Sequence, residues 1–184
     1  MLYWEEAAAA ALQEIYEKPV QSSSIEQIRS YLDGIISDMW TQKPHDSAEM
    51  RISWRRFGAM SRSLGKELNF PIFSGSSDPV HEIVCRKQRD YGHQNISRFG
   101  RQGLMVRLHD KVARLENLLS SGRRPNNESI EDNIVDLIGY SCIAMMWEEG
   151  TFMLACNTST VAESTQPTGS VANFLSSGHR IPQL

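Results

Sequence analysis

Apolar residues recur at intervals of three and four along the first part of the chain, the spacing that places side chains on one face of an α-helix. Five consecutive alanines flanked by glutamates favour a first helix over residues 2–17. A second helix is predicted from a capping signature at Ser24 to a stop before Pro44. Asp46 or Ser47 caps a third helix that runs to about residue 68.

The same spacing continues in the second half of the chain. Asp78 and Pro79 supply a cap and a first helical position for a helix over residues 79–91, which Gly92 ends. Asn127 is the predicted cap of the final helix. Further helices are predicted over residues 104–119 and 128–153, with loops over residues 69–77 and 93–103. No stretch alternates with the period of a β-strand, so the fold class is predicted to be all-α, an antiparallel bundle of five or six helices.

Length and composition favour one domain followed by a tail. The chain has 184 residues, about the size of a single domain. Residues 1–156 are predicted to form one helical domain. Residues 157–184 are rich in Ser, Thr, Gln and Gly and poor in apolar side chains, which cannot offset the entropy lost on ordering, so they are predicted to be a flexible tail.

The charge balance and the cysteines indicate which partners and which compartment to expect. The 19 basic and 22 acidic residues give a net charge of −3, so direct DNA binding and attraction to anionic membranes are not expected. No apolar run is long enough to cross a membrane, and the N-terminus lacks the pattern of a signal peptide. Three cysteines without a C-x-x-C pair favour a reducing compartment. We therefore expect a cytoplasmic protein.

Three acids lie four residues apart on the final predicted helix. Glu128, Asp132 and Asp136 share one face, and Asp136 has apolar neighbours on both sides. One interpretation is a row of oxygen ligands for Mg²⁺. The other is a surface row paired with Arg or Lys of a neighbouring helix. The spacing leaves both open.

Cations and acids also share faces on the two preceding helices. Arg107, Lys111 and Arg114 form a stripe opposite apolar positions, which suits phosphate oxygens but is also common on ordinary amphipathic helices. Glu82 and Asp90 lie four residues on either side of Arg86, so Glu82 is either a further metal ligand or part of an exposed charge ladder.

Three motifs occur in a fixed order: K-x-x-D-Y-G at residues 87–92, V-R-L-x-D-K-x-x-R-L at 106–115, and E-S-I-E-D-x-x-x-D-L-x-x-Y at 128–140. Together they resemble the phage nucleotide-modification-associated domain family, over roughly residues 79–150. That family is similar to the all-α nucleoside triphosphate pyrophosphatases, the MazG-like and dimeric dUTPase enzymes. The resemblance implies a helical bundle that binds a nucleotide with Mg²⁺ and forms a homodimer or homotetramer, in the host cytoplasm if a phage encodes the chain.

The resemblance also implies hydrolysis of a nucleoside triphosphate to the monophosphate and pyrophosphate, and it assigns roles to residues. The implied roles are metal ligands for Glu82, Asp132 and Asp136; a further ligand or the base that activates water for Glu128 and Glu131; and substrate contacts for Lys87, Asp90, Tyr91, Asn95, Arg107, Lys111 and Arg114.

A second hypothesis is a module without turnover, which sequesters a nucleotide or engages a host protein. The pyrophosphatases carry E-x-x-E and E-x-x-D pairs, whereas the acids Asp132 and Asp136 here are separated by a step of four. This departure keeps the non-catalytic alternative open.

Overall fold

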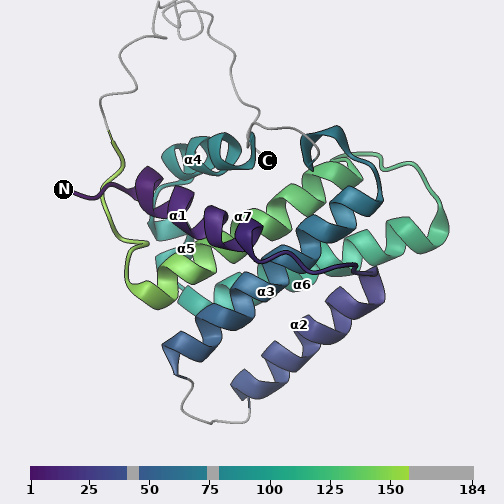
Figure 1. The fold of residues 1–184 in the computed structure, drawn as a ribbon, viewed down its shortest axis with the longest axis horizontal. Helices are drawn as coiled ribbons and strands as arrows, with labels where there is room; N and C mark the ends of the chain where they lie inside the picture. The colour runs from purple at the N-terminus through teal and green to yellow at the C-terminus, as the bar shows by residue number, and fades with distance from the viewer. Residues whose placement is uncertain (41–45, 74–78, 158–184) are drawn as a thin grey trace, which may run out of the picture.

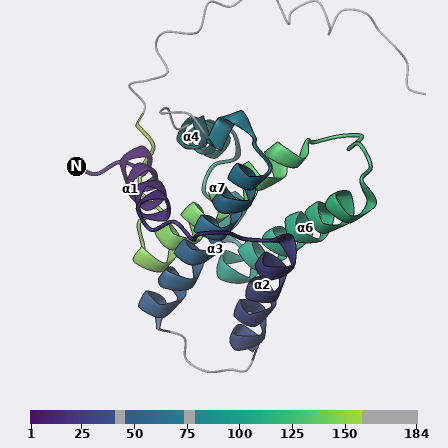
Figure 2. The same cartoon turned by 45° about the vertical axis from the view of Figure 1, so that its right-hand side comes forward.

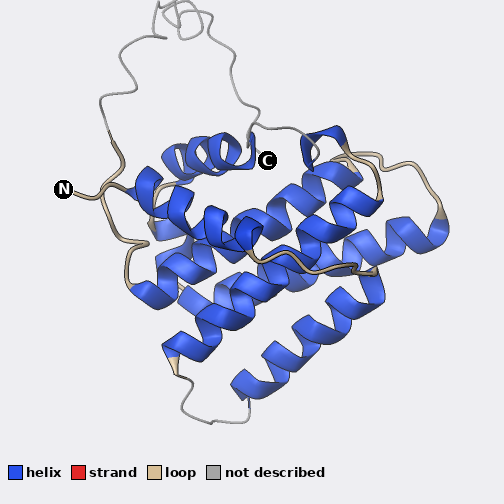
Figure 3. Cartoon of the chain, in the orientation of Figure 1, coloured by secondary structure: helices blue, strands red, loops and turns tan. Residues whose placement is uncertain are grey.

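The described residues of the computed structural model, 1–40, 46–73 and 79–157, contain helices and no β-strand (Figure 3). The all-α prediction is therefore confirmed for this part of the chain. The helices are α1 (Trp4–Glu17), α2 (Ile25–Trp40), α3 (Ser47–Glu67), the 3-10 helix η1 (Pro71–Phe73), α4 (Pro79–Tyr91), α5 (Gln94–Ser97), α6 (Gly100–Ser121) and α7 (Ile130–Glu149) (Figure 1).

Helix α7 lies at the centre of the bundle. Its residues 133–139 are all buried, as expected for a helix that is surrounded on every side. Helices α1, α3, α4 and α6 all pack against it. The most extensive contact is with α3, where a Cβ atom on Gly58 would lie 3.0 Å from Cβ of Ser141 and one on Gly65 would lie 3.2 Å from Ile134. Small residues therefore allow α3 and α7 to approach closely in antiparallel order.

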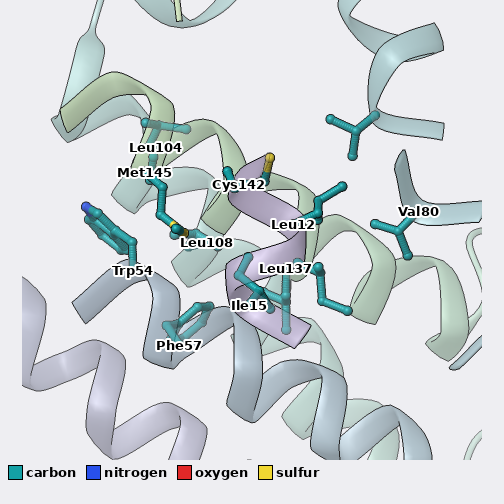
Figure 4. Close-up of a cluster of buried hydrophobic side chains, with 14 of the residues drawn as sticks. Leu12, Ile15, Trp54, Phe57, Val80, Leu104, Leu108, Leu137, Cys142 and Met145 are labelled. Atoms are coloured by element: carbon teal, nitrogen blue, oxygen red, sulfur yellow. The ribbon is translucent and has the colours of Figure 1, made fainter. Parts of the chain in front are cut away.

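Helix α1 contributes its apolar face to the core rather than to the surface. Trp4, Leu12 and Ile15 are at most 1% exposed, and Figure 4 shows Leu12 and Ile15 within a cluster of buried side chains that includes Phe57 and Leu137. These side chains are part of the core of one chain, so they are not available for a subunit interface. The prediction of a homo-oligomer rests on the family resemblance.

Helix α2 packs along α3 and α6 and lies away from α7 (Figure 2). Its Ile28 and Leu32 are fully buried. Arg29 of α2 also forms an ion pair with Glu116 of α6, with an N···O distance of 2.6 Å.

After α7 the chain turns back toward its beginning. Gly150 adopts φ +73°, a left-handed conformation that ends the helix, and the strap (residues 151–157) follows. The Trp4 backbone N–H donates to the Ala155 carbonyl at 3.0 Å, and the Asn157 N–H donates to the Glu5 carboxylate at 2.9 Å. Phe152 is 1% exposed and lies edge-on to Trp4. The strap therefore holds the start of α1 against the end of α7.

Several predicted boundaries were wrong. The 3-10 helix η1 lies inside the predicted loop 69–77, while α5 and the start of α6 lie inside the predicted loop 93–103. Helix α7 begins at Ile130 because Ser129 rather than Asn127 is the cap, and it ends at Glu149 rather than at residue 153. The predicted cap Asp78 and residues 158–184 of the predicted tail lie outside the described residues.

The structure bears on two features noted in the sequence, the lack of a membrane-spanning run and the cysteines. Among the described residues, none of the helices has the length and apolar character needed to cross a membrane. Cys85 and Cys142 are buried, and burial raises the pKa of the Cys85 thiol to about 11. Both thiols are therefore small core side chains rather than nucleophiles.

Candidate functional site

A small pocket opens between α4, α5 and α7. Its volume is about 50 Å³, which is room for a few water molecules. Most of its wall is apolar, and its polar groups come from charged, amide and phenol side chains. The lining residues are Ile83, Val84, Lys87, Gln88, Tyr91, Asn95, Ile96, Val135, Asp136, Gly139, Tyr140 and Ile143.

Asp136 lines this pocket and pairs with two lysines. Its side chain is 10% exposed, and one carboxylate oxygen accepts from Lys87 of α4 while the other lies 2.7 Å from Nζ of Lys111 of α6. Burial lowers the pKa of Lys111, but hydrogen bonds to Asp136 and Glu128 outweigh burial and leave the pKa raised. The ammonium group of Lys111 is therefore charged, and the contacts with Asp136 hold both lysines beside the pocket.

Glu128 pairs with the same group of cations from the loop before α7. Its carboxylate lies 2.6 Å from Nζ of Lys111 and 3.6 Å from a guanidinium nitrogen of Arg114. Arg114 also donates to the Glu128 backbone carbonyl at 2.5 Å. Of the two interpretations of the acid row, pairing with cations of a neighbouring helix is the arrangement that the structure shows for Glu128 and Asp136.

Asp132 has a different local partner. It is the third residue of a capping box: its carboxylate accepts from the Ser129 hydroxyl at 2.7 Å and from the Ser129 backbone N–H at 3.0 Å. These hydrogen bonds lower the pKa of Asp132, and the charges of Lys87 and Lys111 lower it further. Asp132 is thus near both lysines, and its carboxylate also caps the N-terminus of α7.

Arg107 completes the cationic side of the site. Its guanidinium donates to the Asn95 side-chain oxygen at 2.7 Å and lies 5.9 Å from the centre of the Tyr140 ring. Asn95 and Tyr140 both line the pocket, so Arg107 lies behind two residues of its wall. The cations Lys87, Lys111 and Arg107 are thereby placed along one side of the pocket.

The structure brings together some of the predicted site residues and separates others. Lys87, Tyr91, Asn95 and Asp136 line the pocket, while Arg107, Lys111, Arg114, Glu128 and Asp132 are linked to it through the contacts above. Glu82 and Asp90 are exposed on α4, and neither they nor Glu131 line the pocket.

The carboxylates as placed do not fit a magnesium centre. Both oxygens of Asp136 face ammonium groups, and one oxygen of Asp132 is held by Ser129. No group of three or more His, Cys, Asp or Glu side chains suited to a metal ion occurs among the described residues. The lysines already supply the positive charge that a row of acids requires. Magnesium binding stays a prediction from the family resemblance.

One residue of the site was missed from the sequence. Gln88 is 5% exposed and lines the pocket. It lies four residues after Val84 and eight after Val80, so it continues the apolar face of α4 with a polar side chain. A buried amide on an apolar stripe is the signal that identifies it.

A known protein family matches the part of the chain that carries this site. Residues 87–147 match the family model described as nucleotide modification associated domain 1.

The match confirms, over this range, the resemblance to the nucleotide-modification-associated domains. It spans the end of α4, all of α5 and α6 and most of α7, and it therefore includes Lys87, Lys111 and Asp136. No curated protein and no solved structure matches the chain. The similarity to the all-α pyrophosphatases stays a prediction.

Proposed function

We propose that this protein is a nucleotide-binding domain that acts in nucleotide modification. The observation that carries the proposal is an apolar pocket bordered by two lysines that the buried carboxylate of Asp136 fixes in place. In the proposed complex the base enters the pocket, and the phosphates lie against Lys87, Lys111 and Arg107.

The lysines remain able to bind phosphate while they contact Asp136. An ammonium group has three donors, and Asp136 takes one from each lysine. Lys87 is 46% exposed, so its remaining donors face water from which a phosphate can approach. Arg107 adds a planar donor group that matches a phosphate edge. The description of the matching family supports the choice of a nucleotide over other phosphates.

Titration calorimetry with nucleoside mono-, di- and triphosphates tests the proposal. We expect Lys111→Met to weaken binding of all of them by about tenfold, because it removes one charged hydrogen bond. Lys66→Met is the matched control, since Lys66 lies at the end of α3 and does not line the pocket. If no nucleotide binds the wild-type protein, the proposal is wrong.

Magnesium-dependent hydrolysis of a nucleoside triphosphate is the second candidate. It is favoured by the pairing of both Glu128 and Asp136 with Lys111, which brings two carboxylates near each other. Because the lysines occupy these carboxylates, metal binding requires a lysine to move away. Incubation with each common triphosphate and Mg²⁺, with detection of pyrophosphate, separates an enzyme from a binding module.

A further inference from the structure

Gln88 has a hydrogen-bond donor with nothing to bind. Its side chain is 5% exposed, and its amide nitrogen lacks an acceptor among the described residues. Most buried polar groups in folded proteins are paired, because an unpaired donor loses its hydration without compensation. This unpaired donor belongs to a residue that lines the pocket.

The surroundings of Gln88 offer it no structural partner. Val84, Val135 and Gly139 line the same pocket and offer no side-chain acceptor. A Cβ atom on Gly139 would lie 2.9 Å from a methyl group of Val84, so this glycine lets α4 and α7 approach closely. The lining also includes the oxygens of Asn95, Asp136 and Tyr140, but none of them accepts from the amide nitrogen. A molecule in the pocket can therefore supply the acceptor.

We propose that Gln88 donates to a carbonyl oxygen of the bound base and that the pocket selects a pyrimidine. This inference rests on the proposed function and specifies its ligand. At about 50 Å³ the pocket is smaller than a cavity that encloses a whole six-membered ring, so it admits the edge of a base and favours the single ring of a pyrimidine over the larger fused rings of a purine. Uracil, thymine and cytosine each carry a ring carbonyl oxygen that can face Gln88 from this edge.

The position of Gln88 fixes how the nucleotide lies. Lys87 precedes it in α4 and contacts Asp136, whereas the Gln88 side chain is buried and lines the pocket. One turn of helix thus presents a charged donor to the phosphate end and a neutral donor to the base end. Removal of the neutral donor should affect discrimination between bases, and removal of a lysine should not.

The test uses the 5′-monophosphates of uridine, cytidine, adenosine and guanosine as probes. We expect wild-type protein to bind the two pyrimidine nucleotides at least tenfold more tightly than the two purine nucleotides. Gln88→Leu should reduce pyrimidine binding by about tenfold, the effect of losing one buried hydrogen bond and leaving the ligand carbonyl unpaired. Lys111→Met is the control, because it should weaken all four nucleotides by the same factor.

Thermal unfolding separates a binding role for Gln88 from a structural one. Leu removes the unpaired donor, so the melting temperature of Gln88→Leu should equal or exceed that of the wild type. Gln88→Met, with a similar volume and a flexible side chain, is the second variant and should show the same binding loss. A lower melting temperature for both variants would overturn the binding role.

The outcomes also separate this inference from the function on which it rests. If none of the four nucleotides binds, either as the monophosphate or as the di- or triphosphate, the proposed function fails. If purines bind the wild type as tightly as pyrimidines, or if Gln88→Leu and Gln88→Met leave binding unchanged, the nucleotide-binding function stands and the inference about Gln88 is wrong.

Discussion

Replacement of Asp136 by alanine tests how the charged cluster is built. The carboxylate is 10% exposed and holds Lys87 and Lys111, whose side chains are 46% and 19% exposed. Loss of one partner of a buried ion pair costs about 3–5 kcal/mol, because a charge is left without compensation. Lys87 can turn to water and Lys111 keeps Glu128, so we take the lower end of this range.

A loss of about 3 kcal/mol predicts a fall of about 6–12 °C in the melting temperature of a domain of this size. Asp136→Asn should lose less, since it keeps one acceptor oxygen and the shape of the side chain. Scanning calorimetry and urea unfolding measure both variants. Glu148→Gln is the control: its carboxylate is 1% exposed and pairs with Arg101 away from the pocket, so it should lower stability and leave nucleotide binding intact.

A metal site makes the opposite prediction. Crowded ligand carboxylates repel one another without the ion, so Asp136→Ala would hold or raise stability, and Mg²⁺ would raise the melting temperature of the wild type. An Asp136→Ala variant as stable as the wild type, together with stabilisation of the wild type by Mg²⁺, would refute the reasoning from the lysines.

Three further outcomes are expected. Ser129→Ala should cost about 1 kcal/mol in urea unfolding. The pKa of Asp132 is lowered in the folded state, so the stabilising contribution of its carboxylate is present above about pH 4 and is lost as the pH falls through the folded pKa. If the difference in unfolding free energy between Ser129→Ala and the wild type stays constant in acid, the Asp132 carboxylate is not the source of that difference. Truncation after residue 157 should leave the melting temperature unchanged. Truncation after Gly150 should lower the free energy of unfolding by about 3–5 kcal/mol, because the buried Phe152 is lost. Equal destabilisation by the two truncations would contradict the tail prediction. Sedimentation at tens of micromolar protein, a range set by typical affinities, should show a dimer or tetramer, and a monomer would count against the family expectation.

The helices were predictable where local signals were strong. Apolar spacing and a capping signature located α2, and Pro79 together with Gly92 set both ends of α4. The start of α7 was misplaced because Asn127 and Ser129 are both good caps, and only the reciprocal bonds between Ser129 and Asp132 decide between them. Helix α5 has four residues, too few to produce a period.

The candidate site was predictable as a set of charges but not as a set of partners. Helical spacing showed that the acids share a face and that Arg107, Lys111 and Arg114 form a stripe. It could not show that α4 and α6 both run antiparallel to α7 and bring Lys87 and Lys111 to opposite oxygens of Asp136. Such pairings depend on the packing of helices far apart in the sequence, which periodicity does not specify.

The strap is synthesised long after the helix α1 that it helps to cover. The surfaces that cover Trp4, Leu12 and Ile15 include α7 and Phe152, which leave the ribosome more than a hundred residues later. At about 5–20 residues per second, the apolar face of α1 stays uncovered for seconds or longer while the rest of the bundle is made. The nascent protein is therefore exposed to aggregation and to chaperone binding through its first helix, and closure of the strap is among the last steps that end this exposure.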